Sequence, residues 1–145
     1  AYTLEDGLRD FYLSMQERVR QEKVKALFGK LSMIEVKHQD RLFAEYEQIS
    51  DSPLMSRAAF ARKAEAQAME GGLTSEEYLA LYPTDFEVAS EVISLAMGIE
   101  AQALDLYLRA ADTSSRESTK QALRRIAEEE RSHLKLLGEL LDTLV

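Results

Sequence analysis

Both histidines of this 145-residue sequence occur in the same short motif, Glu-x-x-His. The motif is found at Glu35–His38 and again at Glu130–His133. Residues three positions apart in an α-helix lie on the same face, so each motif directs a carboxylate and an imidazole to one spot. Because carboxylate oxygens and imidazole nitrogens both bind metal ions, the two motifs together outline a site for two metals between helices.

The two motifs belong to an internal repeat with an offset of 95 residues. A further glutamate precedes each motif by 30 residues. The matched pairs are Glu5/Glu100, Asp10/Asp105, Tyr12/Tyr107, Leu13/Leu108, Phe28/Leu123, Glu35/Glu130, His38/His133 and Leu42/Leu137. From this repeat we predict six metal ligands: Glu5, Glu35, His38, Glu100, Glu130 and His133.

The composition predicts an all-α fold, because only six Gly and two Pro occur and no long stretch alternates apolar with polar residues. Apolar residues recur at helical spacing in four segments, where we expect long helices at about 3–20, 22–50, 85–111 and 115–144. Segment 51–83, with stops at Pro53 and Gly71–Gly72, is expected to be a crossover with short helices. Its length lets the third long helix run parallel to the second. The sequence therefore predicts one domain, 1–145, built as a four-helix bundle.

The candidate ligands lie on the apolar stripes of these helices. An isolated glutamate is usually a solvated surface group, and we interpret Glu128 and Glu129 in this way. Glu129 also lies four residues before His133, so it could compete with Glu130 as a ligand. Four carboxylates facing one core would repel one another, and two divalent cations would neutralise them. Four carboxylates and two neutral imidazoles make an oxygen-rich donor set that suits iron or manganese, and zinc or cobalt would bind too because affinity alone does not select the metal.

Composition also excludes several classes of function. The formal charge of −8 disfavours nucleic acid and anionic membranes as partners. The absence of cysteine excludes disulfides, thiolate zinc sites and Cys-ligated iron–sulfur clusters. No apolar run approaches the roughly 20 residues that span a bilayer, and no signal peptide is evident. We therefore expect a cytoplasmic protein.

The six positions match the ferritin-like di-iron carboxylate bundle, in which two helices each give a Glu and two each give Glu-x-x-His. The sequence resembles the rubrerythrin branch in particular. The matching motifs are Glu5 with Phe11-Tyr12, Phe28-x-x-Leu31-x-x-x-Glu35-x-x-His38, Ile99-Glu100 with Tyr107, and Leu123-x-x-Ile126-Ala127-x-x-Glu130-x-x-His133. The resemblance implies that Glu5 and Glu100 are terminal ligands and that Glu35 and Glu130 bridge the metals.

Two departures from the rubrerythrin pattern affect the function that the resemblance implies. Ala103 stands where rubrerythrins usually have an extra carboxylate, and no cysteine is present for a rubredoxin module. We expect a di-iron oxidoreductase that reacts with peroxide or O₂ and receives electrons from an external donor protein. Tyr12 and Tyr107 are the candidate catalytic residues near the metals, although core packing is the more common role of such tyrosines. The alternative is a metal-binding, iron-handling or sensing module without turnover.

Two further expectations concern assembly. The third long helix has a second apolar face, formed by Ile93, Met97, Leu104 and Leu108, which predicts cover by the crossover or by a second subunit in a homodimer. The stretch Leu95 to Arg109 and the Glu70-Gly71-Gly72 segment are similar to ferritin-like domains fused behind rhodanese modules. The chain could thus be part of a longer protein with an N-terminal module.

Overall fold

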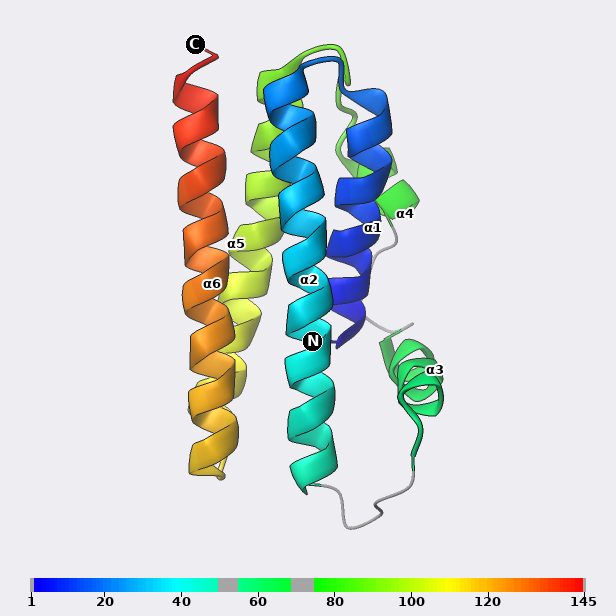
Figure 1. Cartoon of the computed structure of the whole chain (residues 1–145), viewed down its shortest axis with the longest axis vertical. Coiled ribbons are helices and arrows are strands. Elements are labelled where there is room, and N and C mark those ends of the chain that lie inside the picture. The colour runs from blue at the N-terminus through cyan, green and yellow to red at the C-terminus, as the bar shows by residue number, and fades with distance from the viewer. Residues whose placement is uncertain (1, 50–54, 69–74, 145) are drawn as a thin grey trace.

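The computed structural model describes residues 2–49, 55–68 and 75–144, and within these ranges it contains helices but no strand. The helices are α1 (Tyr2–Arg18), α2 (Glu22–Ile49), α3 (Arg57–Ala68), α4 (Ser75–Leu81), α5 (Ala89–Thr113) and α6 (Glu117–Asp142). Figure 1 shows α1, α2, α5 and α6 side by side as a bundle, with α3 and α4 beside α1. The prediction of an all-α, ferritin-like bundle is confirmed.

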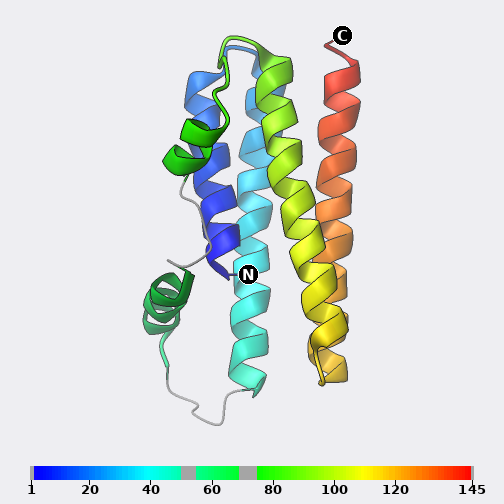
Figure 2. The ribbon, with the colours of Figure 1, turned by 180° about the vertical axis from the view of Figure 1, so that it is seen from behind.

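The bundle consists of two helical hairpins. Short connections at 19–21 and 114–116 make α1 antiparallel to α2 and α5 antiparallel to α6. Seen from both sides, α2 and α5 run in the same direction, as a long crossover permits (Figures 1 and 2). The 95-residue repeat aligns the α1–α2 hairpin with the α5–α6 hairpin. The predicted stops at Pro53 and Gly71–Gly72 lie outside the described residues.

Apolar side chains fill the bundle on the side of the predicted ligands that lies toward the C-terminal end of α1 and the N-terminal end of α2. Phe11, Tyr12 and Phe28 form an aromatic group in which the rings of Tyr12 and Phe28 have centroids 5.2 Å apart. Full burial of each such side chain stabilises the fold by about 1.5–3 kcal/mol. This packed layer holds α1 against α2 and thereby fixes the helix faces on which the polar residues stand.

Helix α3 docks on the α1–α2 hairpin through the ring of Phe60. Its centroid lies 5.1 Å from that of Tyr2, 5.4 Å from that of Phe43 and 4.4 Å from that of Tyr46. Arg57, at the start of α3, forms an ion pair with Asp40 of α2. Aromatic packing therefore attaches the crossover close to the N-terminal end of α1.

Helix α5 begins at Ala89, whereas the sequence predicted a start at about residue 85. Asp85 forms a turn of its own, because its Oδ1 accepts a hydrogen bond from the backbone N–H of Glu87 at 2.9 Å. Glu91 Oε2 accepts from the backbone N–H of Asp85 at 2.9 Å, and Val88 has extended dihedral angles. The local side-chain bonds of Asp85 thus compete with the helix and delay its start.

The second apolar face of α5 is largely covered within the chain. Ile93 is buried, Met97 and Leu104 pack against the core, and Met97 lies beside Gly138 of α6. Leu108 is 37% exposed. A second subunit is therefore not needed to cover most of this face, and homodimerisation stays a prediction. Within the described ranges, no helix is both long and apolar enough to cross a membrane.

Candidate metal centre

Each of the four long helices brings a carboxylate to the interior of the bundle. Helices α1 and α5 each contribute one glutamate, and α2 and α6 each contribute a Glu-x-x-His pair from adjacent turns of one face. All six residues that the sequence predicts as ligands are buried, with at most 2% of their surface exposed: Glu5, Glu35, His38, Glu100, Glu130 and His133. The helices thus bring the whole predicted set together.

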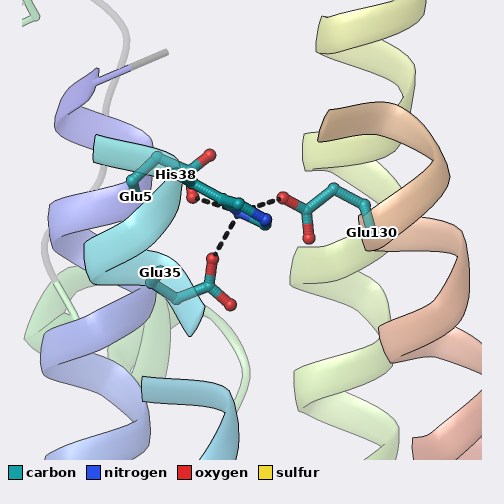
Figure 3. Close-up of side chains that lie close together, drawn as sticks. All are labelled: Glu5, Glu35, His38 and Glu130. Atoms are coloured by element: carbon teal, nitrogen blue, oxygen red, sulfur yellow. Dashed lines mark hydrogen bonds and ion pairs between the residues drawn. The ribbon is translucent and has the colours of Figure 1, made fainter. Parts of the chain in front are cut away.

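The first group of ligands surrounds Nδ1 of His38 (Figure 3). This nitrogen lies 3.1 Å from Glu5 Oε2, 3.0 Å from Glu35 Oε2 and 3.0 Å from Glu130 Oε1. Possible ligand atoms of these four residues all lie within 4.8 Å of one another. Three carboxylate oxygens and one imidazole nitrogen therefore converge on a single point.

The second group surrounds Nδ1 of His133 in the same manner. This nitrogen lies 3.0 Å from Glu130 Oε2, 3.4 Å from Glu35 Oε1 and 3.3 Å from Glu100 Oε1. Glu35 and Glu130 thus present one oxygen to each group. The two imidazole rings stack with centroids 5.6 Å apart. The geometry is that of two adjacent cation positions sharing two carboxylates.

The four oxygens of Glu35 and Glu130 are buried, and none has a hydrogen-bond partner in the described part of the chain. Contacts with the imidazoles at 3.0–3.4 Å lack hydrogen-bond geometry. A buried carboxylate without a partner costs several kcal/mol, whereas a cation between the helices would satisfy all four oxygens. The donor set therefore fits a pair of metal ions.

Burial and mutual contact displace the pKa values of the cluster. Burial raises the pKa of Glu5 above its usual value and raises those of Glu35 and Glu100 to about 8. Burial would also raise the pKa of Glu130, but contacts with both imidazoles outweigh it and hold that pKa at about 2. Burial opposes protonation of His133, yet its close contacts with Glu100 and Glu130 raise its pKa to about 10. Without metal, protons thus neutralise part of the site.

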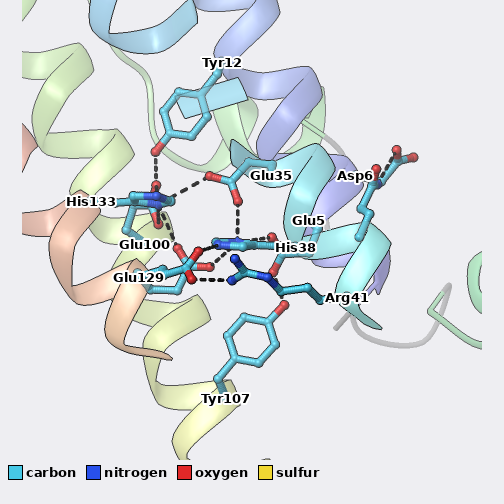
Figure 4. Close-up of polar contacts among 12 residues, drawn as sticks. Glu5, Asp6, Tyr12, Glu35, His38, Arg41, Glu100, Tyr107, Glu129 and His133 are labelled. Atoms are coloured by element: carbon cyan, nitrogen blue, oxygen red, sulfur yellow. Dashed lines mark hydrogen bonds and ion pairs between the residues drawn. The ribbon is translucent and has the colours of Figure 1, made fainter. Parts of the chain in front are cut away.

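Two buried tyrosines link the hairpins at the site (Figure 4). Tyr12 of α1 donates to Glu100 of α5, and Tyr107 of α5 donates to Glu5 of α1. Burial and the neighbouring Glu100 raise the pKa of Tyr12 well above its usual value, so this phenol keeps its proton. The tyrosines that the sequence predicts near the metal site are thus hydrogen-bond donors to the two carboxylates predicted as terminal ligands.

Glu129, which the sequence suggested as a surface residue or as a competitor of Glu130, has a role that sequence reasoning did not predict. Its carboxylate is 37% exposed, but Oε2 accepts a hydrogen bond from His38 Nε2 at 2.9 Å, and Arg41 donates to Oε1 (Figure 4). Glu129 therefore reaches the outer nitrogen of His38 and does not compete with Glu130 at the inner one. Partial burial acts to raise the pKa of Glu129, but hydrogen bonds with Arg41 and His38 outweigh it and lower that pKa.

The aspartates of the repeat lie away from this contact. Asp10 forms an ion pair with Arg9 at 2.8 Å, and Asp105 with Arg109 at 2.6 Å. Both aspartates are more than half exposed. The signal that could have identified Glu129 is its place directly before Glu130, on the edge of the helix face that meets α2.

Comparisons with known proteins agree with this fold. A solved structure of a hypothetical protein from Pyrococcus furiosus matches with a TM-score of 0.67 and 23% sequence identity, over 99% of this chain and 84% of that one. No protein with a curated description matches the sequence. A sequence model of the Rubrerythrin family matches residues 1–141. Since this match extends over nearly the whole chain, the protein belongs to the rubrerythrin family of ferritin-like domains.

Proposed function

We propose that this chain is a non-haem di-iron oxidoreductase domain that reacts with peroxide or O₂ and receives electrons from an external donor protein. The observation that supports this most strongly is the arrangement of Glu35 and Glu130, which each direct one oxygen toward His38 and the other toward His133. None of these carboxylate oxygens has a hydrogen-bond partner among the described residues. An arrangement of this kind suits two cations close enough to share one small oxidant.

The six ligands divide into two roles. Glu35 and Glu130 would hold both ions, and the remaining four ligands would hold one ion per pair: Glu5 with His38, and Glu100 with His133. When bound and reduced, the iron pair would supply the two electrons that break an O–O bond. The buried surroundings exclude bulk water from the carboxylates and keep the donor atoms in place before any ion binds.

The tyrosines orient the terminal carboxylates and retain protons beside them. Tyr107 donates to Glu5 Oε1 and leaves Oε2, which lies 3.1 Å from His38 Nδ1, free to face an ion. Tyr12 donates to Glu100 in the equivalent position. Reduction of peroxide to two waters consumes two protons and two electrons.

The electrons must come from outside the described site. The sequence contains no cysteine to bind an iron–sulfur centre. A separate electron donor protein is therefore part of the proposal.

The test is rapid mixing of the anaerobic Fe²⁺-loaded protein with peroxide or with O₂, followed by absorbance. We expect oxidation to be much faster than that of free Fe²⁺, and Glu35→Ala to abolish the acceleration. Glu128→Ala is the control, because Glu128 is exposed and pairs with Arg131. Oxidation no faster than that of free Fe²⁺, or equally fast in Glu35→Ala, would contradict the proposal.

A metal-binding module without turnover is the second candidate, and one residue favours it. Ala103 stands where rubrerythrins usually have a further carboxylate, and it is fully buried. Because alanine has no metal-binding side chain, this position offers no additional ligand. Such a module would retain two metals per chain but show no repeated oxidation and reduction with any electron donor. Steady-state peroxide consumption with a chemical reductant separates the two candidates.

A further inference from the structure

The two histidines of the metal centre differ at the nitrogen that faces away from the carboxylates. His38 Nε2 donates to Glu129 Oε2 at 2.9 Å, and Arg41 donates to Glu129 Oε1. His133 forms its hydrogen bond through Nδ1, at 3.4 Å from Glu100 Oε2. No residue of the described ranges forms a hydrogen bond with Nε2 of His133. The outer nitrogen of His38 is thus hydrogen-bonded to a carboxylate, whereas the outer nitrogen of His133 has no such partner among the described residues.

This difference originates in the sequence. At the 95-residue offset, Glu129 aligns with Ile34, and Arg41 aligns with Leu136. Ile34 packs against the hydrophobic core. An aliphatic side chain accepts no hydrogen bond, so the second half of the site lacks the group that holds His38. Three candidate ligands in each half match one another, whereas the residues next to the outer nitrogens of the histidines do not match.

We propose that Glu129 is a positioning residue for His38 and makes the Glu5–His38 position the tighter of the two metal positions. This inference rests on the proposed function only in requiring that a metal pair binds. The hydrogen bond fixes the Nε2–H tautomer, so the lone pair of Nδ1 points toward the carboxylates. A carboxylate on the outer N–H also makes the inner nitrogen a stronger metal ligand.

Glu129 acts through the histidine and does not itself contact the metal position. The imidazole ring lies between its carboxylate and Nδ1, which is the nitrogen that faces the other ligands. Arg41 restrains the far oxygen of Glu129 and links α2 to α6 across the site (Figure 4). The charge-assisted contact with Arg41 keeps Glu129 in the orientation that His38 requires.

A double-mutant cycle with Co²⁺ as the probe tests this role in the full chain. Glu129→Leu is combined with His133→Ala and, separately, with His38→Ala, and Co²⁺ affinity is measured by visible absorption. In the His133→Ala background we expect Glu129→Leu to weaken binding about 10–100-fold. In the His38→Ala background we expect no effect, because the imidazole that Glu129 orients is gone. Glu129→Gln keeps an acceptor and should restore most of the affinity.

Glu128→Leu is the matched control, since Glu128 is the preceding residue of the same helix and pairs with Arg131. It should leave Co²⁺ affinity unchanged in both backgrounds. Equal weakening by Glu129→Leu in both backgrounds, or none with His133→Ala, would overturn the positioning role. A wild-type protein that binds neither Co²⁺ nor Fe²⁺ would refute the proposed function and the inference together.

A second measurement needs no variant at position 129. In the Co²⁺-loaded wild-type protein, NMR detects the paramagnetically shifted N–H protons of ligand imidazoles. The Nε2–H of His38, hydrogen-bonded to Glu129, should exchange with water more slowly than that of His133. Equal exchange rates would contradict the proposal even if the variants failed to fold.

Discussion

Glu35 is retained at a position where a carboxylate is unfavourable for folding alone. It is fully buried and lacks a hydrogen bond from the described residues. Desolvation of a buried carboxylate costs several kcal/mol, and the other three glutamates of the cluster already face the two imidazoles, so an apolar side chain is better tolerated here. We therefore expect Glu35 to serve the proposed metal binding, and we expect the metal-free protein to be less stable than its packing allows.

Glu35→Leu should accordingly separate stability from binding. We expect the chelator-treated variant at pH 8.5 to be more stable than the wild type by about 1–4 kcal/mol, because the buried charge is removed. Binding of two metals per chain should be lost. Urea unfolding and elemental analysis measure the two effects. The control is Glu47→Leu on the same helix, where the side chain is exposed and neither property should change.

The displaced pKa values predict how the metal-free protein responds to pH. Burial raises the pKa of Glu35 and Glu100 from 4.5 to about 8, so the folded state binds more protons than the unfolded state between these values. The stabilising contribution is fully present below 4.5 and is lost as the pH rises through about 8. We expect the free energy of unfolding of chelated protein to fall from pH 7 to pH 9. A chelated protein that becomes more stable over this range would contradict the assignment.

At the scale of helices, the apolar spacing and the repeat were sufficient to predict the four-helix bundle, and the repeat selected the six clustered residues. Both predictions rest on residue spacing, which an α-helix converts directly into positions on one face. The start of α5 was less predictable, because the side-chain hydrogen bonds around Asp85 override the helical pattern. The contact of Glu129 with His38 was not predicted for a related reason. His38 lies 91 positions earlier, and the contact depends on how two helices pack, which residue spacing within one helix does not specify.

Tyr12 and Tyr107 connect the two helical hairpins. Tyr12 donates from α1 to Glu100 of α5, so Tyr12→Phe leaves a buried carboxylate without its donor. We expect a loss of about 1–3 kcal/mol in the free energy of unfolding of the chelated protein. Tyr46→Phe is the control, because the Tyr46 hydroxyl donates to the sulfur of Met55, a weak acceptor, at 3.5 Å and should matter less. Equal effects of the two substitutions in urea unfolding would argue against the inter-hairpin bond.

At the scale of the whole molecule, association remains a prediction. The apolar face of α5 is mostly covered by its own chain, which leaves Leu108 as its exposed part. If a homodimer forms through this face, Leu108→Glu should dissociate it, because a charge would be buried at the interface. Sedimentation velocity at micromolar concentration measures this, with Leu13→Glu, at the matched position of α1, as the control. A wild-type monomer would refute homodimerisation.

The division of ligands between the hairpins has a consequence for the origin of the chain. Each hairpin contributes one glutamate and one Glu-x-x-His motif, which is half of the candidate ligand set, and the shared carboxylates come one from each half. A single hairpin paired with an identical copy about a twofold axis would complete the same set. The present chain has the form that duplication and fusion of such a unit would produce. Glu129 and Arg41, opposite Ile34 and Leu136 in the alignment of the halves, mark where the two copies have diverged.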